Sequence, residues 1–158
     1  MPDAPGGIVI YTIARFGADG VASMQILLAD NQPQVRFGLC VLLEHQPGIE
    51  IVGQAVNALD LLAQSRTACP DLVLLDWMLP KMQAADLLAA LHKTCPGVSV
   101  IVLSGRPEAR QASLDAGADG FVGKYELPEK LLAAITQCRC AHESGQQDRI
   151  RQSEEASS

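Results

Sequence analysis

Several polar side chains in this 158-residue sequence directly follow short apolar runs, at the points where buried strands would end. They belong to Asp30, Asn31, Asp76, Ser104 and Lys124, and they comprise two carboxylates, an amide, a hydroxyl and an ammonium group. A hard cation such as Mg²⁺ keeps several waters and takes one or two carboxylates together with phosphate oxygens. The residue types therefore indicate Mg²⁺-dependent phosphoryl transfer onto a carboxylate.

Each of these groups has a part in such a reaction. Asp30 and Asp76 can hold the cation, and Asp76 can also act as the nucleophile that forms an acyl phosphate. The cation and Lys124 would neutralise charge on the transferring group, while Ser104 can donate a hydrogen bond to a phosphoryl oxygen. Taken singly, an aspartate could order a loop or cap a helix, and a lysine could lie at the surface. The functional interpretation depends on all of them meeting at one place.

The segment that leads to Asp76 is the clearest strand of the sequence. Residues 72–75 read Leu-Val-Leu-Leu, bounded by Cys69-Pro70 before and Leu79-Pro80 after. A continuous apolar run of this length suits a strand that is covered on both faces, as in a parallel sheet. Asp76 is then expected where the strand emerges from the sheet.

Five strand patterns alternate with five helical patterns from residue 24 onwards. Strands are expected at 25–29, 49–55, 72–75, 98–103 and 119–123, and helices are expected to begin at 33, 58, 84, 107 and 128. Pro33 suits a first helical position, and Asn57 with Asp60 resembles a capping pair for the second helix. The alternation predicts a parallel sheet with helices on both faces. Because ligands bind at the carboxyl ends of strands in such sheets, the polar groups should converge there.

Composition and charge disfavour several other classes of protein. The net charge of -6 gives no sign of a nucleic-acid-binding surface, and no apolar run approaches the ~20 residues of a membrane span. The five cysteines are scattered without a CxxC pair, which disfavours a zinc site. Cys138 and Cys140 could be read as a redox or metal pair, but residues two apart on a helix face different ways. We expect reduced thiols in a cytoplasmic protein.

The folded domain is expected to occupy residues 24–140. Residues 1–23 lack the basic start and long apolar core of a secretory signal, and we interpret them as a disordered leader or as an extension before a true start at Met24. After residue 140 only Ile150 is a large apolar residue. Residues 141–158 are therefore predicted to form a disordered polar tail.

From residue 24 to about residue 140, the chain resembles the receiver domains of response regulators in bacterial two-component signalling. The matching segments are 27–33 (LLADNQP) with Arg36 and Gly38, 71–80 (DLVLLDWMLP), 102–105 (VLSG) and 116–124 (AGADGFVGK). The first and last segments are most similar to receivers of the NarL type, which usually precede a helix-turn-helix domain. The resemblance implies a doubly wound α/β fold, a flavodoxin-like sheet of five parallel strands in the order 2-1-3-4-5.

The resemblance also implies how the phosphoryl group arrives. Asp76 would accept it from the phosphohistidine of a sensor histidine kinase or of a phosphotransfer protein. Asp30, Asp76 and the backbone carbonyl of Met78 would hold the Mg²⁺ ion. The chain would catalyse only its own phosphorylation and dephosphorylation, so it is not expected to be an enzyme towards other substrates.

Three further residues would turn phosphorylation into a signal. Ser104 would be the switch hydroxyl that moves toward the phosphoryl group, and Phe121 would be the aromatic residue whose rotamer follows. Lys124 would bind the phosphoryl oxygens. The surface formed by the fourth helix, the fifth strand and the fifth helix would then change its preference for a downstream protein or a second copy of the chain.

Three features depart from the family pattern. Asn31 stands where a second acid usually touches the metal, so we expect weaker Mg²⁺ binding and slower phosphorylation from small donors. Residues 81–85 lack the usual glycine-containing turn. The last 18 residues cannot form a helix-turn-helix domain, so we expect a stand-alone receiver, or one whose output domain was lost or is encoded separately.

Other functions remain open on the sequence. A pseudo-receiver would use the same fold as a protein-binding platform without phosphorylation, which Asn31 and the unusual loop would favour. The chain could also be the remnant of a NarL-type transcriptional regulator that lacks its DNA-binding domain. An aspartyl-phosphate phosphatase shares the strand–aspartate arrangement, but that class needs a second acid two residues after the nucleophile, where this chain has Met78.

Overall fold

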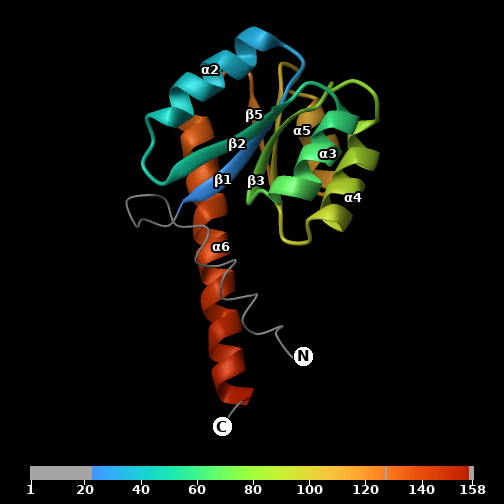
Figure 1. The fold of residues 1–158 in the computed structure, drawn as a ribbon. Coiled ribbons are helices and arrows are strands. Elements are labelled where there is room, and N and C mark those ends of the chain that lie inside the picture. The colour runs from blue at the N-terminus through green and yellow to red at the C-terminus, as the bar shows by residue number, and fades with distance from the viewer. Residues whose placement is uncertain (1–22, 127, 157–158) are drawn as a thin grey trace.

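Strands and helices alternate along the chain, and the strands form a single sheet with helices beside it (Figure 1). The computed structural model describes residues 23–126 and 128–156. The strands are β1 (Met24–Ala29), β2 (Ile49–Ala55), β3 (Leu72–Asp76), β4 (Ser99–Ser104) and β5 (Gly120–Gly123). The helices are α2 (Pro33–Glu44), α3 (Ala58–Ala68), α4 (Ala84–Thr94), α5 (Ala109–Asp115) and α6 (Pro128–Ala156). All strand pairs are parallel and their order is β2-β1-β3-β4-β5, which confirms the predicted topology.

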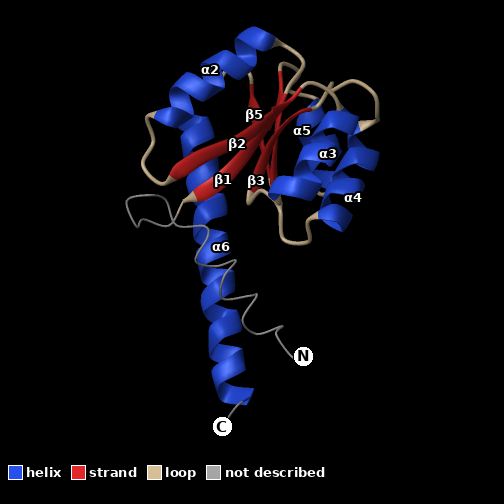
Figure 2. Ribbon diagram, viewed as in Figure 1, coloured by secondary structure: helices blue, strands red, loops and turns tan. Residues whose placement is uncertain are grey.

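Helices cover both faces of the sheet (Figure 2). Neighbouring residues of a strand point to opposite faces, and β1 follows this rule. Leu27 and Ala29 belong to the core that includes residues of α3, α4 and α5, whereas Ile26 and Leu28 belong to the core that includes α2 and α6. Because both faces are covered, all five residues of β3 are buried, as the continuous apolar run predicts.

Several residues that the sequence predicts to begin or end helices take these positions in the structure. Pro33 is the first residue of α2. The side chain of Asn57 accepts a hydrogen bond of 2.8 Å from the backbone N–H of Asp60 at the start of α3. Asp60 in turn accepts from the N–H of Val56, one residue before the cap. Gly117 follows α5 with φ of +106°, a conformation that costs glycine little.

Helix α6 shows that one prediction from the sequence is wrong. The predicted disordered tail over 141–158 is instead a continuation of α6 as far as Ala156 (Figure 1). Leu131, Ile135 and Cys138 dock the first part of the helix on the sheet, so the costly nucleation of a helix is already achieved. The Glu, Gln, Arg and Ala residues that follow have favourable helix propensities, so further turns add without an apolar face.

Two predictions concern the ends of the chain and its relation to a membrane. The leader predicted over residues 1–23 lies outside the described residues, apart from residue 23. None of the described helices combines the length and the apolar content that a membrane crossing requires.

Candidate functional site

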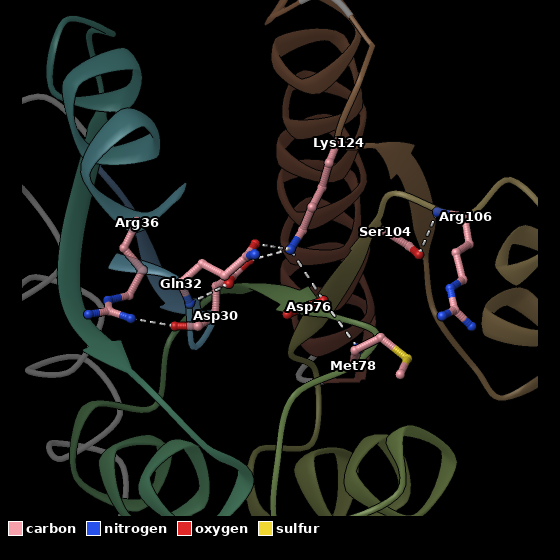
Figure 3. A network of polar contacts seen from close by, with 8 residues as sticks. All are labelled: Asp30, Gln32, Arg36, Asp76, Met78, Ser104, Arg106 and Lys124. Atoms are coloured by element: carbon pink, nitrogen blue, oxygen red, sulfur yellow. Dashed lines mark hydrogen bonds and ion pairs between the residues drawn. The ribbon is translucent and has the colours of Figure 1, made fainter. Parts of the chain in front are cut away.

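The carboxyl ends of four strands bring together the polar residues that the sequence singles out (Figure 3). Asp30 directly follows β1, Asp76 is the last residue of β3, Ser104 is the last residue of β4 and Lys124 directly follows β5. Backbone hydrogen bonds hold these ends in register: the N–H of Lys124 donates to the carbonyl of Ser104 at 2.8 Å. The predicted convergence is therefore present at one edge of the sheet.

The ammonium group of Lys124 links the two carboxylates of this edge. Its Nζ lies 2.7 Å from Oδ2 of Asp30 and 3.4 Å from Oδ1 of Asp76. It also donates a hydrogen bond of 3.3 Å to Oε1 of Gln32. Figure 3 shows Lys124 reaching between the two aspartates from the end of β5. One cation thus balances two carboxylates that are 1% and 5% exposed.

Asp30 is held by two residues to which the sequence assigns no role. Its Oδ1 accepts a hydrogen bond of 2.9 Å from the backbone N–H of Gln32. Its backbone carbonyl accepts a hydrogen bond of 2.6 Å from Nη1 of Arg36, whose Nε donates to the side chain of Gln54 on β2. Gln32 and Arg36 stand two and six residues after Asp30, in the segment that resembles the receiver family, and that is the sequence signal that could have indicated these contacts.

Burial is the main influence on the charge of Asp76. It raises the pKa of that carboxyl above its ordinary value of 3.8. The backbone N–H of Met78 donates to Oδ1 at 3.1 Å and acts in the opposite direction. The negative charge of Asp30 raises the same pKa further, and the ammonium group of Lys124 lowers it. The net result is a carboxyl group that is harder to ionise than that of a free aspartate.

This pKa has a consequence for stability. Because the folded protein holds the proton of Asp76 more tightly than the unfolded chain does, the contribution to stability is complete below pH 3.8 and is lost as pH rises through the folded-state pKa. In metal-free buffer we expect Asp76→Asn to unfold at a Tm about 3 °C higher than the unmodified protein near neutral pH. The difference should vanish in acid, as thermal scans across pH would show.

The matched control for that experiment is Glu50→Gln, which neutralises an exposed carboxylate on β2. Its Tm should follow that of the unmodified protein across the whole pH range. A Tm for Asp76→Asn that equals or falls below that of the unmodified protein near neutral pH would show that ionised Asp76 does not destabilise the fold.

The two predicted switch residues, Ser104 at the end of β4 and Phe121 within β5, have partners of their own. The hydroxyl oxygen of Ser104 accepts a hydrogen bond of 3.1 Å from the backbone N–H of Arg106 (Figure 3). The ring of Phe121 is buried, and the guanidinium carbon of Arg110 lies 4.9 Å from its centroid. Arg110 also lies 3.8 Å from Glu126, so α5 is tied to the segment after β5.

The loop between β3 and α4, residues 77–83, continues directly from Asp76. The carbonyl of Pro80 accepts a hydrogen bond of 2.9 Å from the N–H of Ala58, which fastens the loop to the start of α3. Lys81 has φ of +85°, so a non-glycine residue takes the left-handed conformation that the missing glycine would supply. The side chains of Asn31 and Met78 are exposed.

The chemistry of the donor set fits a Mg²⁺ ion. Oδ2 of Asp30 is buried and accepts no hydrogen bond, although it pairs electrostatically with Lys124. Within the described ranges, no group of three or more His, Cys, Asp or Glu residues could enclose a metal ion. One or two carboxylates are the protein ligands that Mg²⁺ takes, with waters and phosphate oxygens completing its coordination. Asp30, Asp76 and the backbone of Met78 are the groups that would hold it.

Comparison with known families gives one match that covers most of the chain. Residues 26–136 match the family of response regulator receiver domains. The virulence-factor transcription regulator BvgA of Bordetella pertussis is 36% identical over 112 residues, which are 70% of this chain and 53% of BvgA. The response regulator VraR of Staphylococcus aureus is 28% identical over 72% of this chain and 55% of VraR. The chain spans about half the length of the curated relatives that it matches.

Solved structures agree with this assignment. A two-component response regulator of the LuxR family from Aurantimonas sp. SI85-9A1 superposes with a TM-score of 0.67 at 27% identity, covering 73% of this chain and 84% of that one. The signal receiver domain of the response regulator NarL from Mycobacterium tuberculosis also superposes with a TM-score of 0.67, at 25% identity, covering 73% and 95%.

Proposed function

Because this chain belongs to the family of response regulator receiver domains, we propose that it accepts a phosphoryl group on Asp76 and signals through a changed protein-binding surface. The donor would be the phosphohistidine of a sensor histidine kinase or of a phosphotransfer protein. The observation that carries the proposal is the placement of Lys124 between the carboxylates of Asp30 and Asp76, 2.7 and 3.4 Å away.

Phosphoryl transfer at this site would proceed by attack of a carboxylate oxygen of Asp76 on the phosphorus atom of the donor. The bond between phosphorus and the donor nitrogen breaks, and the imidazole takes up a proton from solvent. A bound Mg²⁺ ion would supply charge neutralisation at the phosphoryl oxygens. Lys124 already faces the Asp76 carboxylate, so its ammonium group can pair with a phosphoryl oxygen without movement of a helix or strand.

Phosphorylation of Asp76 would change the hydrogen bonding of Ser104. Through Ser104, the change would be passed to the surface of the protein. In this structure the hydroxyl oxygen of Ser104 accepts from the N–H of Arg106. A phosphoryl oxygen near Lys124 is an acceptor for the hydroxyl proton, so a move of Ser104 would shift the start of the β4–α5 loop. The neighbouring ring of Phe121 and its contact with Arg110 on α5 would follow. A downstream protein, or a second copy of the chain, would read this change.

The test is phosphorylation of the purified protein with Mg²⁺ and either acetyl phosphate or a phosphorylated histidine kinase. We expect one acid-stable, base-labile phosphate per chain, absent in Asp76→Asn and present in the Glu50→Gln control. If neither donor produces such a phosphate on the folded protein, the proposed signalling function is wrong.

Asn31 is the observation that favours a second candidate, a receiver that binds its partner without phosphorylation. It leaves the cation site one charge short, and charge count is a main determinant of affinity for hard cations. That function would be supported if the folded protein took up no phosphate from either donor and still bound a partner.

The missing charge can be restored. Asn31→Asp is expected to tighten Mg²⁺ binding by roughly three- to tenfold, because a further carboxylate joins the two already present. Trp77, the only tryptophan of the chain, is adjacent to Asp76 and reports binding by fluorescence titration. The control is Gln137→Glu, which adds the same charge at an exposed position of α6. An unchanged affinity in Asn31→Asp would show that position 31 does not face the cation.

A further inference from the structure

Two cysteines meet at the ends of α3 and α4, which pack side by side on one face of the sheet (Figure 1). Cys69 is the residue that ends α3, and Cys95 is the residue that ends α4. Both contact one backbone carbonyl, that of Ser65: the N–H of Cys69 donates to it at 2.9 Å and Sγ of Cys95 donates to it at 3.3 Å. This shared carbonyl brings the two cysteines together.

The two thiols differ in their access to solvent. Cys69 is exposed, whereas Cys95 is 7% exposed. Burial, together with the neighbouring Cys69, raises the pKa of the Cys95 thiol to about 11. A reagent dissolved in water therefore meets Cys69 first, and Cys95 lies behind it as a second thiol within reach. An accessible first thiol with a second thiol beside it allows a two-step thiol–disulfide exchange.

The backbone at Cys69 gives a further sign of constraint. Cys69 has φ of +43°, in the left-handed region where glycine or asparagine usually ends a helix. A residue with a side chain, such as cysteine, adopts this left-handed backbone conformation only at an energetic cost. Glycine would end the helix at a lower energetic cost. The presence of cysteine is explained if its sulfur has a partner.

We propose that Cys69 and Cys95 form a reversible disulfide when the protein meets a low-molecular-weight disulfide such as oxidised glutathione. The thiolate of Cys69 attacks one sulfur of the reagent, forming a mixed disulfide and releasing one reduced reagent molecule. The Cys95 thiol then loses its proton and attacks Sγ of Cys69, which forms the internal disulfide and releases the second reduced molecule. Two protein thiols are oxidised and one reagent disulfide is reduced.

This disulfide is separate from phosphoryl transfer. Cys69 and Cys95 lie at the carboxyl ends of their helices, next to the amino ends of β3 and β4, whereas Asp76 lies at the carboxyl end of β3. Closing the pair joins two helix ends across a loop of about 27 residues, which restricts the unfolded chain. We therefore expect oxidation to raise stability and to change the rate of phosphoryl uptake by less than about twofold.

The other three cysteines supply the control. Cys40 and Cys138 belong to the opposite face of the sheet, with α2 and α6, and Cys140 is exposed two residues further on. Cys138 and Cys140 thus face different environments, as predicted. Cys140→Ser removes an exposed thiol without touching the pair, so it matches Cys69→Ser in chemistry and in exposure.

The experiment is oxidation of the full chain with oxidised glutathione at mildly alkaline pH, followed by acid quenching, peptide mapping and thermal scans. We expect a peptide linked through Cys69 and Cys95, and a Tm about 5–10 °C above that of the reduced protein. Both should be present in Cys140→Ser, absent in Cys69→Ser and reversed by a thiol reductant.

Two results would overturn the proposal. One is a glutathionyl group that stays on Cys69 while Cys95 remains free to alkylation in unfolding buffer. The other is a linkage of either cysteine to Cys40, Cys138 or Cys140. Both are read from the unmodified protein, so they stand even if Cys69→Ser fails to fold. Because neither depends on phosphate, failure here is distinguishable from failure of the signalling function.

Discussion

The Lys124→Met variant is expected to lose about 2–3 kcal/mol of unfolding free energy near neutral pH, measured by urea denaturation in metal-free buffer. Lys124 is 22% exposed, and its ammonium group is the cation placed between Asp30 and Asp76. Removing it leaves two buried carboxylates close to each other without a balancing charge. Methionine keeps most of the apolar length of the side chain, so lost packing contributes little.

The cause of that loss can be separated from general damage by acid and by Mg²⁺. A protonated Asp76 carries no charge to balance, so the difference between the variant and the unmodified protein should shrink as pH falls through the raised pKa of that carboxyl. Addition of Mg²⁺ should restore part of the stability, because a cation held by Asp30 and Asp76 neutralises the same two groups.

Lys130→Met is the matched control for Lys124→Met. Lys130 is 67% exposed and lies 3.6 Å from Glu126, four residues earlier in the chain. An ion pair whose cation is this exposed contributes little, so its loss should cost about 0.5 kcal/mol or less and should not respond to Mg²⁺. Equal losses in the two variants would show that the charge of Lys124 is not held by the buried aspartates.

The sheet and the position of the site could be predicted because each depends on local signals. The apolar run that ends at Asp76 is bounded by turn-forming residues, and the structure has β3 at Leu72–Asp76 with every residue buried. Once the strands are parallel, their carboxyl ends share an edge, so Asp30, Ser104 and Lys124 had to lie near Asp76. No knowledge of side-chain conformation was needed for that step.

The contacts within the site could not be predicted, because they depend on side-chain direction. The hydrogen bond between Gln32 and Lys124 joins residues 92 positions apart, and no pattern of residue types indicates it. Ser104 lies at the predicted edge, yet its hydroxyl oxygen turns to the N–H of Arg106. A strand end fixes where a residue lies but leaves several rotamers open.

The wrong prediction for residues 141–158 has a different origin. Scarcity of apolar residues indicates that a segment cannot build a core of its own. It does not indicate what happens when the segment continues a helix that is already docked, as α6 is through Leu131 and Ile135. Propensity then decides, and the residues after 140 favour a helix up to Ala156.

Asp30→Asn is expected to slow Mg²⁺-dependent phosphoryl uptake from acetyl phosphate by about 100-fold or more, while the protein stays folded. The amide oxygen of asparagine can still accept the N–H of Gln32, which now donates to Oδ1 of Asp30 at 2.9 Å. The negative charge at Oδ2 is lost, and an NH₂ group there would face the ammonium group of Lys124. The cation site would keep Asp76 as its only carboxylate within the part of the chain that the structure describes.

The same substitution should change the titration of Asp76 in a way that a loss of folding would not. The charge of Asp30 is one of the causes that raise the pKa of the Asp76 carboxyl, so that pKa should fall in Asp30→Asn. NMR titration of the carboxyl carbon would measure it. Slow uptake together with a lowered pKa in a folded protein would therefore assign the defect to the missing cation ligand.

Asp71→Asn is the control that distinguishes a site residue from a buried aspartate. Asp71 is also buried, and its Oδ2 accepts a hydrogen bond of 2.9 Å from the N–H of Gln25, but it lies at the amino end of β3. It should lower stability by no more than about 1 kcal/mol, because the amide oxygen still accepts that hydrogen bond but more weakly than a carboxylate, and it should leave the rate of phosphoryl uptake within about twofold. If Asp71→Asn slows uptake as much as Asp30→Asn does, the rate depends on the sheet as a whole, and Asp30 has no special place in the chemistry.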